Sequence, residues 1–250
     1  MVVAGSWTRT EVGGVHYVRH AVRTRWFTEN DDLRSALREA LPPLEPGDTV
    51  VLSEKATVFL TGRAVPVDEL RPSRLALLLA GLVRPRPGSR GLSVPEKMQY
   101  VVRTTGGARI LAAALAGAVT RPLRIRGVFY RVAGPVARDI DGGRPPYEHL
   151  VLPPFTVSDA QALCAELETF LGAGVAIVDL NDYGGSIRAV SARSLPADVL
   201  FAALSGNPLG QRASSTPFGI VRRDDDGGSV AGGSAAGERS SQQLGRVSQH

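Results

Sequence analysis

Apolar residues recur along this chain with two different periods, and the two periods alternate, which predicts a protein of mixed strands and helices. Short segments rich in valine, isoleucine and aromatic residues, bounded by glycine, proline or aspartate, indicate strands. They cover 15–27, 49–56, 125–134, 175–185 and 218–223. Apolar residues spaced three and four apart indicate helices over 31–41, 73–83, 95–103, 106–119, 158–171 and 196–204.

Several of these helices have recognisable starting residues. Asp31 or Asp32 can cap the first helix, and Ser73 can cap the second. Ser158 and Gln161 have the spacing of a capping box, so the helix over 158–171 is expected to begin at Ser158. The helices over 73–83 and 106–119 are so apolar that we expect both to be buried on every face.

The order of strands in a sheet cannot be derived from these patterns, so the prediction stops at an α+β fold, a mixed sheet with packed helices. Residues 1–223 are expected to form one domain. Residues 224–250 are rich in glycine and serine, have little to bury, and are expected to be a disordered tail.

The longest nearly apolar run, 110–119, is shorter than the ~20 residues of a membrane-spanning helix. The N-terminus lacks the pattern of a secretion signal, so we expect a cytoplasmic protein without a membrane partner. The single cysteine, Cys164, excludes an internal disulfide and a multi-cysteine zinc cluster, and its helical position predicts core packing.

The net charge of +5 and the pI near 9.9 suggest an anionic partner, such as a nucleotide, a phosphorylated cofactor or nucleic acid. The chain contains no block of consecutive basic residues, which disfavours nucleic acid. Almost all basic residues are arginines. Lys55 and Lys97 are the two lysines, which makes both worth attention.

Polar residues that follow buried strands are the first candidates for a site. Ser53, Glu54 and Lys55 follow one such strand, and an ammonium group at this place can contact phosphate oxygens as a compact charge. A surface lysine paired with a neighbouring carboxylate explains the same residues.

Asp139 and Asp141 lie two residues apart in a glycine-rich segment, where two carboxylates can bind one magnesium ion through oxygen. A solvated turn is the alternative interpretation. Asp179, Asn181 and Asp182 close the strand over 175–185, and the glycines after them would let a ligand approach the backbone. An ordinary turn explains these residues too.

The sequence contains no Walker motif, dinucleotide-binding fingerprint, zinc-protease motif or serine-hydrolase elbow. His149 is the one histidine in a candidate loop, where it can serve as a general base or simply be exposed.

Three segments together resemble the coenzyme F-420 γ-glutamyl ligases. They are the opening over 44–70, with Gly47-Asp48, Lys55 and Gly62-Arg63, the segment 127–142, and the strand over 175–185. The segment 207–223 resembles the end of a ligase-like subgroup, so the resemblance covers roughly 15–223.

The resemblance implies a GTP-dependent ligase that joins a small-molecule carboxylate to an amino acid through an acyl phosphate. It implies an intertwined homodimer with magnesium or manganese as cofactor. Lys55 and Arg63 would be catalytic, and Asp139, Asp141 and Asp182 would bind the metal. The residues that would contact substrate or nucleotide are Ser53, Arg126, Tyr130, Arg131, His149, Asn181 and Gly184.

Two family segments are replaced here, by 125–141 and by the strand ending at 185, so a ligase with another substrate fits the sequence equally well. A second hypothesis is a non-catalytic binding protein that keeps the fold. It predicts that the carboxylates are scattered, or neutralised by arginines such as Arg138 and Arg144.

Overall fold

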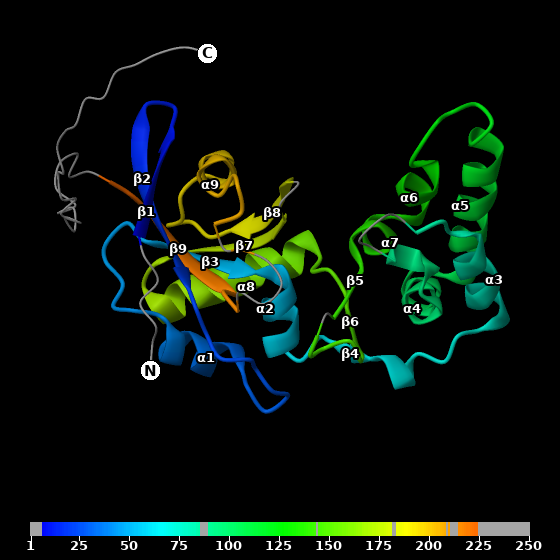
Figure 1. Ribbon diagram of the computed structural model, residues 1–250, viewed down its shortest axis with the longest axis horizontal. Helices are drawn as coiled ribbons and strands as arrows, with labels where there is room; N and C mark the ends of the chain where they lie inside the picture. The colour runs from blue at the N-terminus through cyan, green and yellow to red at the C-terminus, as the bar shows by residue number, and fades with distance from the viewer. Residues whose placement is uncertain are drawn as a thin grey trace, which may run out of the picture.

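The computed structural model describes residues 7–85, 90–143, 145–181, 184–208, 210 and 215–224, and for Asn181 it describes the backbone alone. Residues 225–250 of the predicted tail, Asp182 and Arg144 lie outside these residues. The described chain forms two parts joined by three short strands (Figure 1). We call them the sheet unit, which holds the large sheet with α1, α2, α8 and α9, and the helical unit, which holds α3 to α7.

The sheet unit is built on a six-stranded mixed sheet with the order β1-β2-β9-β3-β7-β8. The strands are β1 (Trp7–Val12), β2 (Val15–Val22), β3 (Thr49–Ser53), β7 (Gly174–Asn181), β8 (Gly184–Val190) and β9 (Phe218–Arg223). β3 and β7 are parallel, and the other neighbours are antiparallel. Because β3 and β7 run in the same direction, the residues that follow them meet at one edge of the sheet.

Helices cover both faces of this sheet (Figure 1). α1 (Leu33–Ala40) and α8 (Val157–Leu171) pack on one face, and α9 (Ala197–Ala203) packs on the other. α1 has the apolar face that the spacing predicted, and Leu37 at its centre is fully buried. Cys164 is also fully buried in this core, which confirms the interpretation as core packing.

The helical unit has its own hydrophobic core, which includes Met98, Val101 and Ile110. Its helices are α3 (Arg74–Leu82), α4 (Pro95–Thr105), α5 (Gly107–Thr120), α6 (Val128–Ala133) and α7 (Pro135–Asp139), with short 3-10 helices at Val67–Glu69 and Gly91–Ser93. A small antiparallel sheet of β4 (Val65–Pro66), β6 (Leu150–Leu152) and β5 (Asp141–Gly142) links the two units. The α+β class and the mixed sheet are therefore confirmed.

The prediction of a strand over 125–134 is wrong, because these residues form a turn and then α6. Gly127 begins the helix with a φ of 78°, in the left-handed region that glycine adopts easily. Phe129 then packs closely on Gly117 of α5, where an added Cβ would come within 3.3 Å of the phenylalanine Cβ. The apolar residues thus face a neighbouring helix and not a sheet.

The strand over 49–56 is shorter than predicted. β3 ends at Ser53, and α2 (Glu54–Leu60) follows with no loop between them. Glu54 and Lys55 therefore lie in the first turn of a helix. The composition of 137–149 predicts a loop, but this segment contains the end of α7 and the short strand β5.

The two very apolar helices are not buried on every face, so that prediction is wrong as well. Leu78 of α3 and Leu115 of α5 are about 60% exposed. The same holds for neighbouring side chains, all with more than 40% exposure: Leu77, Leu82, Leu111, Val119, Leu123 and Ile125. The apolar residues of these two helices therefore divide between the core of the helical unit and its surface.

The start of α8 provides a direct test of helix capping. The structure places the cap at Thr156, whose Oγ1 accepts a hydrogen bond from the Asp159 backbone N–H at 3.1 Å, and Ser158 lies inside the helix. We therefore expect Thr156→Ala to lower the free energy of unfolding by about 1 kcal/mol. Ser158→Ala should change it by less than about 0.5 kcal/mol. Urea unfolding of both variants checks this, and equal losses would contradict the assignment.

None of the helices in the described part of the chain has the length and apolar character needed to cross a membrane.

Candidate functional site at the junction of the two units

The carboxyl edge of β3 and β7 faces the helical unit, and charged side chains from both units meet there. We call this group the junction cluster. It contains four acidic and four basic residues, namely Glu54, Asp139, Asp141, Asp179, Lys55, Lys97, Arg138 and Arg188.

The two lysines of the chain meet at one carboxylate. Lys55 Nζ lies 2.7 Å from Asp141 Oδ2, and Lys97 Nζ lies 3.9 Å from Asp141 Oδ1. Lys97 reaches this place from α4 through close packing on Gly142, where an added Cβ would come within 2.9 Å of the ammonium group. Lys55 also lies 3.9 Å from Asp179, which lies near the end of the parallel strand β7. The two lysines that stand out in the sequence therefore both lie next to Asp141.

Arg188 of β8 is the second centre of the cluster. Its Nε donates to Glu54 at 2.9 Å, its Nη1 donates to Asp139 at 2.8 Å, and its Nη2 lies 3.6 Å from Asp179. Glu54 is 6% exposed and also accepts a hydrogen bond from the Phe155 backbone N–H at 3.0 Å. Arg188 therefore binds carboxylates from both units with one guanidinium group.

Burial and neighbouring cations shift the pKa values of the carboxylates in opposite directions. Burial alone would raise the pKa of Asp141, but the ammonium groups of Lys55 and Lys97 hold this pKa below its usual value. Asp139 behaves in the same way, because hydrogen bonds from Arg138 and Arg188 outweigh its burial and lower the pKa. For Glu54, burial prevails over the attraction of Arg188 and raises the pKa.

The structure brings some of the predicted site residues into this cluster. Lys55, Asp139 and Asp141 belong to it, and Ser53 precedes it as the last residue of β3. Gly184 begins β8 opposite Asn181, and open space surrounds the position of an added Cβ. That space is compatible with the predicted ligand approach.

Other predicted residues lie elsewhere. Arg126 is exposed in the segment before α6, and Tyr130 and Arg131 lie on α6. His149 is 58% exposed and lies 3.7 Å from Glu29 on the sheet unit. Their roles in binding remain predictions.

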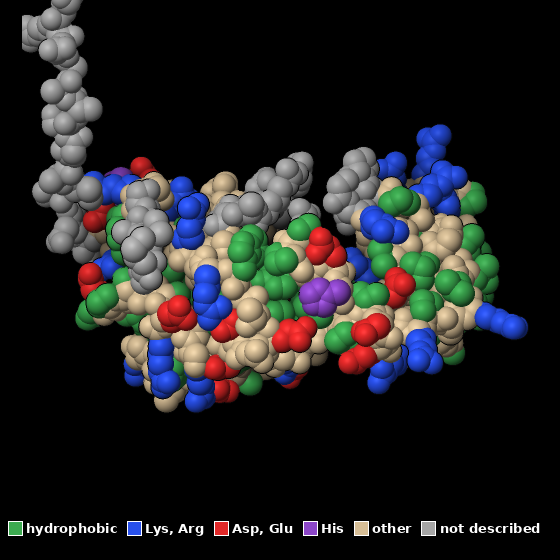
Figure 2. Space-filling model, turned by 60° about the horizontal axis from the view of Figure 1, so that its bottom comes forward, with side chains coloured by type: hydrophobic (Ala, Val, Ile, Leu, Met, Phe, Trp, Pro, Cys, Tyr) green, Lys and Arg blue, Asp and Glu red, His purple; other side chains and the backbone are tan. Residues whose placement is uncertain are grey.

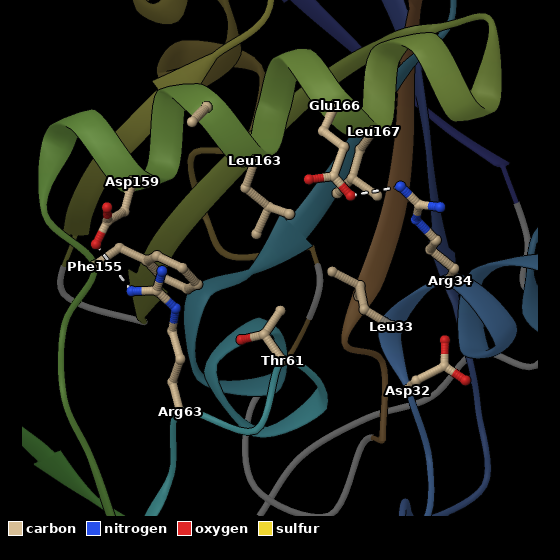
Figure 3. Close-up of a pocket in the computed structure, with 11 residues that line it drawn as sticks. Asp32, Leu33, Arg34, Thr61, Arg63, Phe155, Asp159, Leu163, Glu166 and Leu167 are labelled. Carbon is tan, nitrogen blue, oxygen red and sulfur yellow. Dashed lines mark hydrogen bonds and ion pairs between the residues drawn. The ribbon is translucent and has the colours of Figure 1, made fainter.

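Arg63 lies in a different place from Lys55. Lys55 lies in the first turn of α2, whereas Arg63 follows the C-terminal end of this helix at Leu60. Arg63 lines a shallow groove of about 450 Å³ between α1, α8 and the end of α2 (Figure 3). There it pairs with Asp159 at 2.9 Å and lies over the ring of Phe155 at 4.7 Å. In this arrangement Arg63 pairs with Asp159 and Lys55 with Asp141, and a common role for the two cations stays a prediction.

Sequence reasoning did not select Glu54 or Arg188 as site residues. Glu54 stands beside Lys55 in the first candidate segment, so the signal was present. Arg188 lies in a strand without a distinctive pattern, among many other arginines, and only the pairing of β7 with β8 reveals its place.

The chain matches no protein-family model and no curated protein in sequence. The functional argument therefore rests on the geometry of the junction cluster.

Proposed function

We propose that the chain is a nucleotide-dependent amide ligase that acts on small carboxylates and uses the junction cluster as its active site. The observation that supports this most is the convergence of Lys55 and Lys97 on Asp141, beside the ends of two parallel strands. Such an edge is a usual ligand site in sheets with parallel strands. Ammonium groups there can offset the charge of transferred phosphate.

The proposed reaction has two steps. An oxygen of the substrate carboxylate attacks the γ-phosphorus of GTP or ATP, which gives an acyl phosphate and a nucleoside diphosphate. The amine of an amino acid then attacks the acyl carbon, and inorganic phosphate leaves. Lys55 would hold the phosphate oxygens in both steps, and a carboxylate beside it, such as Asp179 at 3.9 Å, can accept the proton that the amine loses.

The residues present are compatible with magnesium or manganese in part. Asp141 and Asp179 offer carboxylate oxygens with 41% and 30% exposure, and magnesium commonly takes one or two carboxylates together with substrate phosphates. When bound, the ion would neutralise phosphate charge. Asp139 fits less well, because Arg138 and Arg188 donate to both of its oxygens. Within the described residues, no three His, Cys, Asp or Glu side chains form a metal-binding group.

A specific observation favours the second hypothesis, a binding protein without catalysis. This hypothesis predicts that arginines neutralise the carboxylates, and Asp139 is paired in that way with Arg138 and Arg188. Lys55 and Asp141 stay more accessible, with 44% and 41% exposure, which is why we favour the ligase.

We also propose that the protein acts as a homodimer. Residues 70–139 contain thirteen Lys or Arg against two Asp or Glu, whereas the remainder of the chain is acidic on balance. Basic side chains surround apolar ones on the helical unit (Figure 2). The acidic balance of the remaining residues would complement this apolar and basic face in a second copy. Sedimentation or light scattering should therefore give twice the monomer mass, and Leu78→Glu with Leu115→Glu should give the monomer.

The ligase proposal is tested by binding of GTP and ATP, each with magnesium or manganese, measured by calorimetry and by thermal shift. We expect metal-dependent binding by the wild type, and a loss of about tenfold or more in affinity in Lys55→Ala and Asp141→Asn. Arg34→Ala is the control, because it removes a cation of the groove, 2.6 Å from Glu166.

Binding that needs metal and both junction residues would justify a screen for carboxylate and amine substrates. The absence of binding for both nucleotides would contradict the ligase and leave the binding protein. An equal loss of nucleotide affinity in Arg34→Ala would show that the affinity depends on the overall charge of the protein and not on the junction cluster.

A further inference from the structure

Arg188 occupies a position that none of the roles above explains. Its side chain is 14% exposed, and all three of its outer nitrogen positions face carboxylates, those of Glu54, Asp139 and Asp179. A guanidinium group is the usual protein partner of carboxylate and phosphate groups because its fork matches two oxygens. A largely enclosed arginine of this kind either holds the two units together or binds a ligand.

The three carboxylates differ in how firmly they are held. Glu54 belongs to the sheet unit, as Arg188 does, and is fixed further by the Phe155 backbone N–H. Asp179 lies on the neighbouring strand β7. Asp139 comes from the helical unit, and it keeps Arg138 as a partner if it leaves Arg188. Asp139 is therefore the one hydrogen-bonded partner of Arg188, among these three carboxylates, that comes from outside the sheet unit.

The same arrangement occurs at Lys55. Asp141, two residues after Asp139, comes from the helical unit and contacts the ammonium group, and it keeps Lys97 as a second partner. Two carboxylates of one short segment thus occupy two cations of the sheet unit. The two cations, Arg188 and Lys55, therefore lie where a ligand with two anionic groups could reach both.

We propose that Arg188 is an anion-binding residue of the junction, and that Asp139 occupies the place of a ligand oxyanion when the ligand is absent. The ligand class is a small molecule with at least two negative groups, either phosphates or carboxylates. One of them replaces Asp139 on Arg188 while another approaches Lys55. This inference rests on the proposed function only in placing the substrate at the junction.

The test uses the full chain and two simple probes, inorganic tripolyphosphate and the dicarboxylate glutarate, titrated by calorimetry at constant ionic strength. In Asp139→Asn the competing charge is gone, so we expect about tenfold tighter binding of the probe that matches the ligand. In Arg188→Lys the charge remains but the fork is lost, and we expect about tenfold weaker binding. The probe that responds identifies phosphate or carboxylate as the source of the oxyanion.

Glu69→Gln is the matched control, because it removes one negative charge from an exposed position near the start of the helical unit. It should leave both affinities unchanged. Tightening in Asp139→Asn that exceeds the control supports the inference, even where Arg188→Lys folds poorly. Unchanged affinity in Asp139→Asn, or tightening of equal size in Glu69→Gln, would overturn it and leave Arg188 as a structural tie. The titration requires neither nucleotide nor amide formation, so it can fail while the ligase proposal stands.

Discussion

Arg188→Met is expected to lower the free energy of unfolding by about 3 kcal/mol at pH 8. The variant leaves Glu54 buried at 6% exposure without its cationic partner, and removal of one partner from a buried ion pair costs about 3–5 kcal/mol. We expect the lower end of this range because Asp139 keeps Arg138 and Asp179 is partly exposed. Urea unfolding followed by circular dichroism measures the loss.

The loss should depend on pH in a defined direction. Burial raises the pKa of Glu54 in the folded protein, and Arg188 opposes this shift. Without Arg188 the folded-state pKa rises further above the unfolded value. A carboxyl with a raised folded-state pKa destabilises the fold above that pKa and ceases to do so below the unfolded pKa. The deficit of Arg188→Met should therefore shrink between pH 8 and pH 5.

A second variant separates the charge of Glu54 from other effects. Glu54→Gln combined with Arg188→Met removes the buried charge, so the double variant should be more stable than Arg188→Met at pH 8. Arg193→Met is the control for loss of an arginine, because that side chain is 67% exposed. A deficit of Arg188→Met that stays constant between pH 5 and pH 8 would contradict this assignment of the charges.

Local patterns in the sequence were sufficient for most elements. The helix over 31–41 begins after Asp32, and the helix over 73–83 begins after Ser73, because a side-chain oxygen there accepts from a free backbone N–H. The strand over 175–185 was recognisable from its apolar run, although the structure divides it between β7 and β8. These features depend on residues that are close together in the chain, so the sequence alone is enough to predict them.

Features that depend on distant neighbours could not be predicted. The segment 125–134 has the composition of a strand, but it folds as a helix because Phe129 packs on Gly117. The basic residues show no consecutive block, yet twelve of those that the structure describes lie in the helical unit and the segments that lead into it. Lys55 and Asp141 were each named as candidates, but their contact at 2.7 Å depends on how the two units meet.

Gly185→Ala is the second variant for which we expect a large loss, about 2–5 kcal/mol of the free energy of unfolding. Gly185 pairs with Leu180 where β8 approaches β7, and its φ is 150°. An added Cβ would overlap the carbonyl oxygen of Asp179 and lie 2.8 Å from the Leu180 Cα. Overpacking against backbone costs about 1–3 kcal/mol, and a strained backbone conformation adds about 1–3 kcal/mol.

The neighbouring glycine is the matched control. Gly184 also has a positive φ, of 125°, but open space surrounds the position of an added Cβ, so Gly184→Ala should lose only the conformational part, about 1–3 kcal/mol. The difference matters for the site because Asp179 and Arg188 face each other across the same strand pair. Displacement of the Asp179 backbone should therefore also weaken binding of any junction ligand in Gly185→Ala. Equal urea midpoints for the two variants would show that β8 does not approach β7 as closely as the structure has it.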